Sequence, residues 1–189
     1  MNKFKTIILL TICILTASCV KEKREATYNN QEDKIDQYIS KNMYVKHTVD
    51  GVQKEDTLNV VYRGGSSRLI TQEGIGEALK PNGTVSFYYA GYTFSGSKSY
   101  TNMFATNREA TASEAKWTLT DAQYSLYTID MRNTEIIEGL RDGLIGVKSG
   151  EICQILFSGK HAFGKKPVGI IPANSAILFE IWVEAVSNE

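Results

Sequence analysis

The fold of this chain is decided by residues 135–144, which read EIIEGLRDGL. Ile136, Leu140 and Leu144 recur every four residues, which places them on one face of a helix. Gly146 and Gly150 follow at once and end the helical pattern. The stretch therefore predicts one short helix, whose apolar face has to be covered by another element.

The stretches on either side of this helix have the patterns of β-strands. Residues 85–94 are rich in aromatic and β-branched side chains, and residues 176–186 alternate apolar side chains with Glu180 and Glu184. Shorter strands are predicted at 58–62, 117–119, 124–129 and 151–157. An antiparallel sheet with one wet face and a single helix predicts an α+β domain in which the helix covers the sheet.

Several short blocks occur in a fixed order between residues 81 and 187. They are Tyr89-Ala90-Gly91 followed by Phe104, the helix 135–144, Gly150-Glu151, Ala162-Phe163-Gly164, and GIIPANS at 169–175 followed by LFEI at 178–181. Each block alone is a weak signal, but the ordered set is specific. Together they resemble the FKBP-type peptidyl-prolyl cis-trans isomerases, in a domain spanning residues 57–189.

The resemblance implies an antiparallel sheet of five to six strands wrapped around one short helix, with an apolar pocket between them. Carried over position by position, the catalytic set is Tyr89, Phe104, Ile137, Phe163 and Phe179. The substrate-binding set is Tyr127, Ile136, Leu140 and Ile171. The family also uses the backbone N–H at the position of Ile137 to hold a substrate carbonyl, and it needs no cofactor and no metal.

The expected reaction is rotation about the X–Pro amide in proline-containing polypeptides, which assists the folding of exported proteins. Three positions depart from the family pattern: Ala105 replaces Asp, Leu140 replaces Trp and Phe163 replaces Tyr. These departures keep one alternative open, a catalytically weak binding module or chaperone attached to an envelope complex. The extra segment at residues 31–79 keeps a second one open, a structural lipoprotein in which this segment docks a partner.

The N-terminus has the order of a bacterial export signal. Two lysines precede an apolar run at 7–17, which is too short to span a bilayer as a helix. The run ends in LTASC, which resembles a lipobox with Cys19 as the lipidated residue. We therefore expect a lipoprotein signal peptide over 1–18 and a lipid anchor at Cys19. An ordinary signal peptide with an incidental cysteine is the alternative.

The lipid anchor would attach the protein to the cell envelope, at the outer membrane, facing either the periplasm or the exterior. Residues 19–56 are expected to form a tether, solvated from Val20 to about Asp33, and a short helix within 31–42.

Composition excludes two further classes. The chain balances 21 Lys and Arg against 21 Asp and Glu, so it has no overall basic field for nucleic acid. His47 and His161 have no Cys or acidic neighbours at metal-ligand spacing, so no metal site is predicted. Cys153 lies in an apolar strand pattern and is expected to be a buried core residue rather than a nucleophile.

Overall fold

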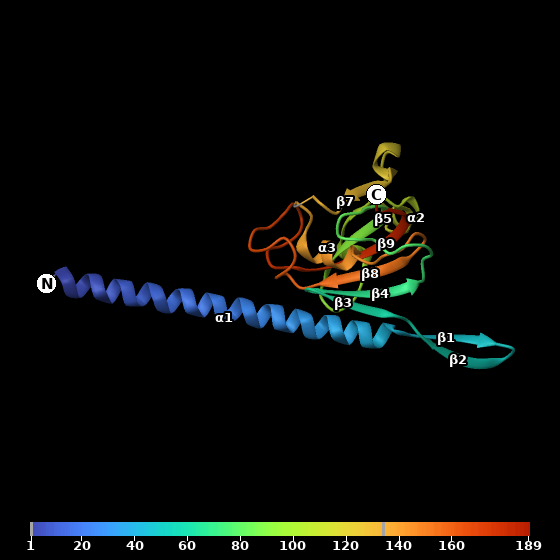
Figure 1. The fold of residues 1–189 in the computed structure, drawn as a ribbon. Coiled ribbons are helices and arrows are strands. Elements are labelled where there is room, and N and C mark those ends of the chain that lie inside the picture. Colours follow the sequence, from blue (N-terminus) through green and yellow to red (C-terminus); the bar gives the residue numbers. More distant parts are fainter. Residues whose placement is uncertain (1, 134) are drawn as a thin grey trace.

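The computed structural model describes the backbone of residues 2–133 and 135–189 and the side chains from Val20 onward within these ranges, apart from Val49. The body is a seven-stranded antiparallel sheet in the order β3-β4-β8-β9-β5-β6, with β7 paired to β5 (Figure 1). The strands are β3 (Val60–Arg63), β4 (Ser66–Gln72), β5 (Thr84–Phe94), β6 (Met103–Thr106), β7 (Tyr127–Asp130), β8 (Ile152–Phe157) and β9 (Ala176–Ser187). The α+β class is confirmed, with a sheet slightly larger than expected.

One face of the sheet, which we call the α3 face, packs against helix α3 (Glu138–Leu144). Leu140 and Leu144 are buried in this core, as their spacing predicts. A Cβ on Gly139 would lie 2.3 Å from the Phe157 ring, so only glycine lets the helix approach β8 this closely. The helix begins later than residue 135 because Ile137 has a non-helical backbone, with ψ at 130°.

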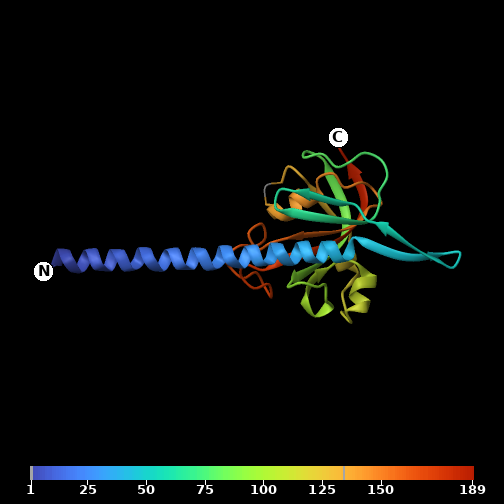
Figure 2. The ribbon, with the colours of Figure 1, turned by 90° about the horizontal axis from the view of Figure 1, so that it is seen from below.

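The opposite face, which we call the α1 face, is covered by helix α1 (Asn2–Asn42), as Figures 1 and 2 show. Ile35 and Ile39 are buried there against a core that includes Tyr92 and Leu178. The face expected to be wet is therefore partly dry. We did not predict this because the packing partners of α1 lie far away in the chain.

The segment from Val20 to Asp33, expected to be a solvated tether, is instead helical and attached to the domain. The buried Tyr28 donates a hydrogen bond from its hydroxyl to Asn174 Oδ1 at 2.7 Å. Gln31 Nε2 donates to the Asn174 carbonyl at 2.8 Å. These contacts join residues more than 140 positions apart, so the local charge pattern gave no sign of them.

Several smaller elements also differ from the sequence predictions. Residues 117–119 are irregular rather than a strand, because the Trp117 N–H bonds back to the Ala112 carbonyl at the end of α2 (Glu109–Glu114). A hairpin of β1 (Tyr44–Val49) and β2 (Val52–Thr57) projects from the body beyond the end of α1 (Figure 1). Two short 3₁₀ helices span Tyr100–Asn102 and Asp121–Tyr124.

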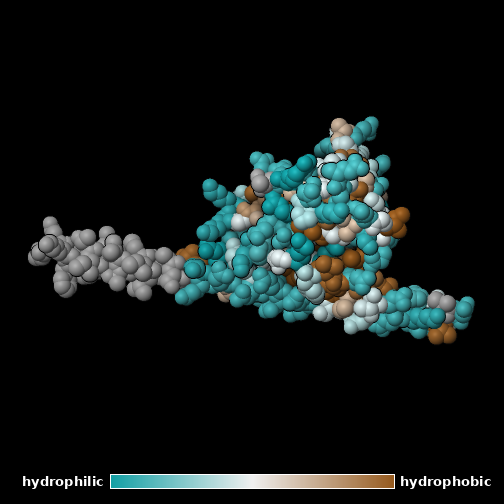
Figure 3. All heavy atoms as spheres, in the orientation of Figure 1, coloured by the Kyte–Doolittle hydropathy of each residue, from teal (hydrophilic) through white to brown (hydrophobic). Residues whose placement is uncertain are grey.

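The export and lipidation predictions fall on residues 1–19, whose side chains lie outside the described part, so Cys19 stays a prediction. Among the helices of the described residues, none combines the length and apolarity needed to cross a membrane. In the view of Figure 3, the described part of α1 shows a mostly hydrophilic surface.

Candidate functional site

A cavity of about 270 Å³ opens on the α3 face, between the sheet and the start of α3. Its lining is almost entirely apolar and mostly aromatic: Phe87, Tyr89, Phe104, Ala105, Tyr127, Ile137, Leu140, Phe163 and Phe179. Strands β5, β6, β7 and β9 supply most of these side chains, and Ile137 and Leu140 come from α3 and its N-cap. A concave apolar site of this kind is a natural place for a small hydrophobic group.

The aromatic rings hold one another in place through edge contacts. Phe104 stands nearly perpendicular to Phe179, with ring centroids 5.8 Å apart, and to Phe163 at 6.3 Å. Tyr89 meets Phe179 at 6.1 Å and Tyr127 at 5.9 Å. Edge-to-face packing is the geometry that aromatic quadrupoles favour. The walls are therefore mutually positioned, with Phe179 at the floor, 5% exposed.

Backbone features on β5 allow this arrangement. A Cβ on Gly91 would lie 2.6 Å from Phe104 and 2.9 Å from Phe179, so glycine makes room for both rings. The buried Asn107 accepts a hydrogen bond from the Tyr89 N–H at 2.6 Å through its side-chain oxygen. Its amide nitrogen donates to the Ser125 carbonyl at 2.9 Å, ahead of β7. Asn107 therefore links the two strands that carry Tyr89 and Tyr127.

The structure brings most of the predicted site residues together around this cavity, with two exceptions. Ile136 lines an adjoining cavity of about 260 Å³, which shares Tyr127, Ile137 and Leu140 with the first. Ile171 is buried in the same core but does not line the cavity. Their backbone positions explain this, since Ile136 precedes the helix and Ile171 lies in an isolated bridge with Val168.

Sequence reasoning missed two members of the site. Phe87 lines the cavity, and its alternation with Tyr89 along β5 was the signal that could have identified it. Asn107 carried no such signal, because its role depends on backbone groups of two other segments.

The cavity has no charged side chain in its lining. Its lining contains no acid, no base and no thiol. Burial raises the pKa of Tyr89, and the neighbouring Tyr127 adds to this shift, so the phenol stays protonated. The backbone N–H of Ile137 has no hydrogen-bond partner among the described residues, which leaves a donor at the wall.

Groups that could support other chemistry lie elsewhere or are absent from the described residues. Cys153 is fully buried, and burial raises the pKa of its thiol well above the usual value, so it is a core residue. No group of three or more His, Cys, Asp or Glu side chains gathers for a metal within the described residues.

Comparison with known proteins agrees with the geometry. Residues 76–184 match the family described as FKBP-type peptidyl-prolyl cis-trans isomerase. The isomerase FkpA of Buchnera aphidicola is 25% identical over 153 residues, which cover 80% of this chain and 52% of that protein. FK506-binding protein 1 of Aspergillus oryzae is 23% identical over 117 residues, covering 62% of this chain and 94% of that protein. The chain thus spans about half the length of the first relative.

Solved structures show the same fold. FkpA from Escherichia coli aligns with a TM-score of 0.52 at 20% identity, covering 95% of this chain and 70% of that one. A peptidyl-prolyl cis-trans isomerase from Pseudomonas syringae aligns with a TM-score of 0.55 at 17% identity, covering 87% and 96%. The matched segment contains all the cavity residues and more than half of the chain. The chain therefore belongs to the FKBP-type peptidyl-prolyl cis-trans isomerases.

Proposed function

We propose that this protein catalyses cis-trans isomerisation of X–Pro bonds in exported polypeptides, as a lipid-anchored protein of the cell envelope. The observation that carries the catalytic part is the cavity of mutually positioned aromatic rings, within the segment that matches the family. The N-terminal sequence ending at Cys19 supports the anchored location.

The mechanism needs no proton transfer. Resonance gives the X–Pro amide a rotation barrier of about 20 kcal/mol. The twisted transition state loses this conjugation, so its carbonyl is less polar than in either planar isomer and prefers an apolar surrounding to water. A cavity walled by Tyr89, Phe104 and Phe179 therefore binds the twisted form more tightly than the planar ones.

The Ile137 N–H has a separate task in this mechanism. It donates a hydrogen bond to a substrate carbonyl and so orients the proline ring toward the floor at Phe179. Leu140, buried at the base beside it, gives that floor an aliphatic surface in place of the family's usual tryptophan.

The test of catalysis uses two substrates: a short X–Pro peptide and a protein whose refolding is limited by a native cis-proline. We expect the chain to accelerate both, because an apolar cavity acts on the amide rather than on one side chain. Failure of a folded chain to accelerate either substrate would refute the catalytic proposal.

Anchoring has its own test. Growth with a labelled fatty acid is expected to label the wild-type chain in a bacterial host, and Cys19→Ser is expected to abolish the label. An unlabelled wild-type chain, exported and cleaved elsewhere, would instead indicate an ordinary signal peptide.

A second candidate function rests on the cavity lining itself. Ala105 and Phe163 lack the carboxylate and hydroxyl usual in the family, so the site has fewer polar groups to orient a ligand. A binding module or chaperone with weak catalysis would suppress aggregation of an unfolded client at concentrations where isomerisation is undetectable. The two assays run side by side distinguish it from the first candidate.

A further inference from the structure

A groove runs along one flank of α1, on the face of the domain opposite the catalytic cavity. It consists of two adjoining cavities of about 510 and 430 Å³, which meet at Lys34. One wall is α1 from Lys23 to Asn42, and the other is segment 94–98, which starts at the last residue of β5. In Figure 2, α1 runs between β3–β4 on one side and the green segment after β5 on the other.

The groove is lined by basic side chains and by no acidic ones. Lys23, Lys34, Lys41 and Lys98 contribute to it. Lys98 is already paired with Glu180, at 2.9 and 3.0 Å from its two carboxylate oxygens. The other three have no ion-pair partner among the described residues, and they share one flank of α1 because their spacings of 11 and 7 residues approximate whole helical turns. Three positive charges of the groove are thus uncompensated.

Two acidic residues of α1 lie away from this flank. Glu32 and Asp36 line a different cavity, on the side of the helix that faces β3 and β4, together with Tyr62 and His161. The lining of the groove thus contains four lysines and no acidic side chain, while these two carboxylates lie at another cavity. Such segregation favours an anionic occupant, because the attraction is not cancelled locally.

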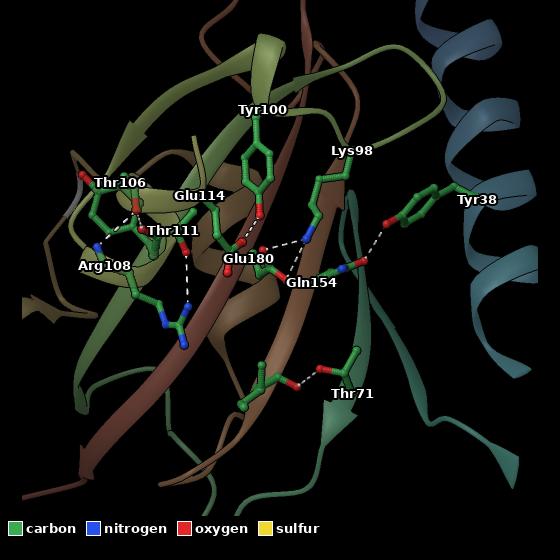
Figure 4. A network of polar contacts seen from close by, with 12 residues as sticks. Tyr38, Thr71, Lys98, Tyr100, Thr106, Arg108, Thr111, Glu114, Gln154 and Glu180 are labelled. Carbon is green, nitrogen blue, oxygen red and sulfur yellow. Dashed lines mark hydrogen bonds and ion pairs between the residues drawn. The ribbon is translucent and has the colours of Figure 1, made fainter. Parts of the chain in front are cut away.

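The groove also has uncharged donors and an apolar floor. The side chains of Asn30, Gln37 and Ser97 make no hydrogen bonds with other described residues. Phe94 and Tyr38 meet edge to face at 5.3 Å beneath them. Figure 4 shows Tyr38 reaching from α1 toward the sheet, near Lys98. This combination matches a chain that carries carboxylates and apolar groups along an extended backbone.

The dimensions fit a single extended strand. Lys23 and Lys41 are 18 residues apart, about 27 Å along a helix. That distance corresponds to about eight residues of extended polypeptide. A bilayer presents a broad flat surface, whereas this groove is walled on both sides by α1 and segment 94–98. The shape therefore favours a polypeptide over a membrane surface.

We propose that the α1 groove binds an extended acidic segment of a client polypeptide, outside the catalytic cavity. The identification of the occupant as a client rests on the proposed function, but the binding itself does not. Segment 94–98 leads through the 3₁₀ turn at Tyr100–Asn102 to Phe104, so one groove wall is continuous with one wall of the catalytic cavity. A client held in the groove stays attached to the protein while its prolines enter and leave the cavity.

The test measures binding without turnover. A fluorescein-labelled, proline-free peptide of eight residues, alternating Glu with Ser and Leu, is titrated with the full chain in neutral detergent, and anisotropy is followed at 50 and 300 mM salt. We expect binding that weakens several-fold at the higher salt, because solvent screens exposed charges. Lys34→Gln with Lys41→Gln is expected to weaken it about five- to tenfold. Both lysines are exposed, so the variant keeps the fold.

A matched control removes the same charge elsewhere. Lys46→Gln with Lys54→Gln alters two exposed lysines of the projecting hairpin and is expected to leave peptide affinity unchanged. Both double variants are expected to isomerise a short uncharged X–Pro peptide at the wild-type rate. Equal peptide affinity of the two variants, or equal binding of a peptide with Gln in place of Glu, would overturn the proposal.

Two further outcomes distinguish peptide binding in the groove from binding to a lipid surface and from the proposed isomerase function. Loss of binding to phosphatidylglycerol vesicles in the Lys34→Gln, Lys41→Gln variant, with acidic-peptide binding unchanged, would overturn the proposal in favour of a lipid surface. A chain without isomerase activity that still binds the acidic peptide through Lys34 and Lys41 would refute the proposed function and leave the groove assignment standing.

Discussion

The two faces of the central sheet are both covered by a helix, yet only one keeps a cavity with aromatic walls. On the α3 face, a short helix sits close to β8 and leaves space between its N-terminal end and β5, β6 and β9. On the α1 face, Ile35 and Ile39 pack against Tyr92 and Leu178 and fill the interface. The short helix thus leaves an aromatic cavity beside its first turn, whereas the long helix fills the interface beneath it and leaves a groove along its flank.

Polar contacts also hold the α1 face, and Figure 4 shows several of them. Tyr38 donates to Gln154 at 2.9 Å, and Tyr100 donates to Glu114. Beneath them, burial and the nearby Glu180 raise the pKa of Tyr92 far above that of an exposed phenol. The cavity on the α3 face contains no ion pair among its lining residues. The two faces thus differ in their sites: the α3 face has an apolar cavity without charged groups, and the α1 face has a docked helix with a groove lined by lysines along its flank.

The largest expected effect comes from substituting Leu178 and Phe179, two neighbours on β9 that point to opposite faces of the sheet. Phe179→Ala is expected to cost about 3–5 kcal/mol of unfolding free energy, and Leu178→Ala about 2–5 kcal/mol. Urea unfolding measures both. Only Phe179→Ala is expected to lose most of its turnover, because Leu178 is buried on the α1 face. Equal loss of turnover per folded molecule in the two variants would contradict the separation.

The next largest effect concerns the attachment of α1. Ile39→Ala removes a side chain that is 1% exposed, and we expect a loss of about 2–3 kcal/mol, toward the low end for such changes because a helix at the surface can shift into the space. Turnover of a short peptide should be unchanged. Ser40→Ala, at an exposed position of the same helix, is the control. A large drop in turnover would show that the faces are coupled.

A smaller effect is expected from restoring polar groups at the cavity on the α3 face. Ala105→Asp with Phe163→Tyr restores two polar groups at the cavity, and each added hydrogen bond is worth about 1 kcal/mol. We therefore expect several-fold tighter binding of a proline peptide, measured by calorimetry, with the fold intact. Ala110→Asp adds the same charge at an exposed position of α2 and should have no effect. Unchanged affinity in the restored variant would show that these groups do not meet the substrate.

The smallest expected effect is that of pH. Because burial raises the pKa of Tyr89 above its usual value near 10, its neutral form persists through the whole range from pH 6 to 9. The ratio kcat/KM should therefore be flat over this range, measured with a peptide that does not titrate. A pH-dependent step in kcat/KM within this range would contradict a mechanism that needs no proton transfer.

The two faces also differ in how far the sequence predicts them. The α3 face is encoded locally: Leu140 and Leu144 repeat at helical spacing, and Phe87 and Tyr89 alternate along one strand. These patterns, with the family blocks, predicted the fold class and most of the cavity lining. The same resemblance placed Ile136 and Ile171 in the site, but both lie beside the cavity. A match between sequence blocks does not show which way each side chain points.

The α1 face could not be predicted in the same way. Tyr28 and Gln31 lie in a charged, Asn-rich stretch, and what makes this stretch an ordered, docked helix is its contact with Asn174 far along the chain. Strand β4 was missed for a similar reason. Its Arg68 is buried because it donates hydrogen bonds to the carbonyls of Gly143 and Ile145 at the end of α3. Long-range polar partners of this kind leave no periodic trace in the sequence.

The central claim is that the aromatic cavity on the α3 face turns prolyl bonds. The most direct test is exchange NMR of a short X–Pro peptide at equilibrium with a catalytic amount of the full chain in neutral detergent. The account predicts a cis-trans exchange rate that rises in proportion to the chain added, and that falls back toward the uncatalysed rate with Phe179→Ala at temperatures where this variant is folded. A folded wild-type chain that leaves the exchange rate of the peptide unchanged would contradict it.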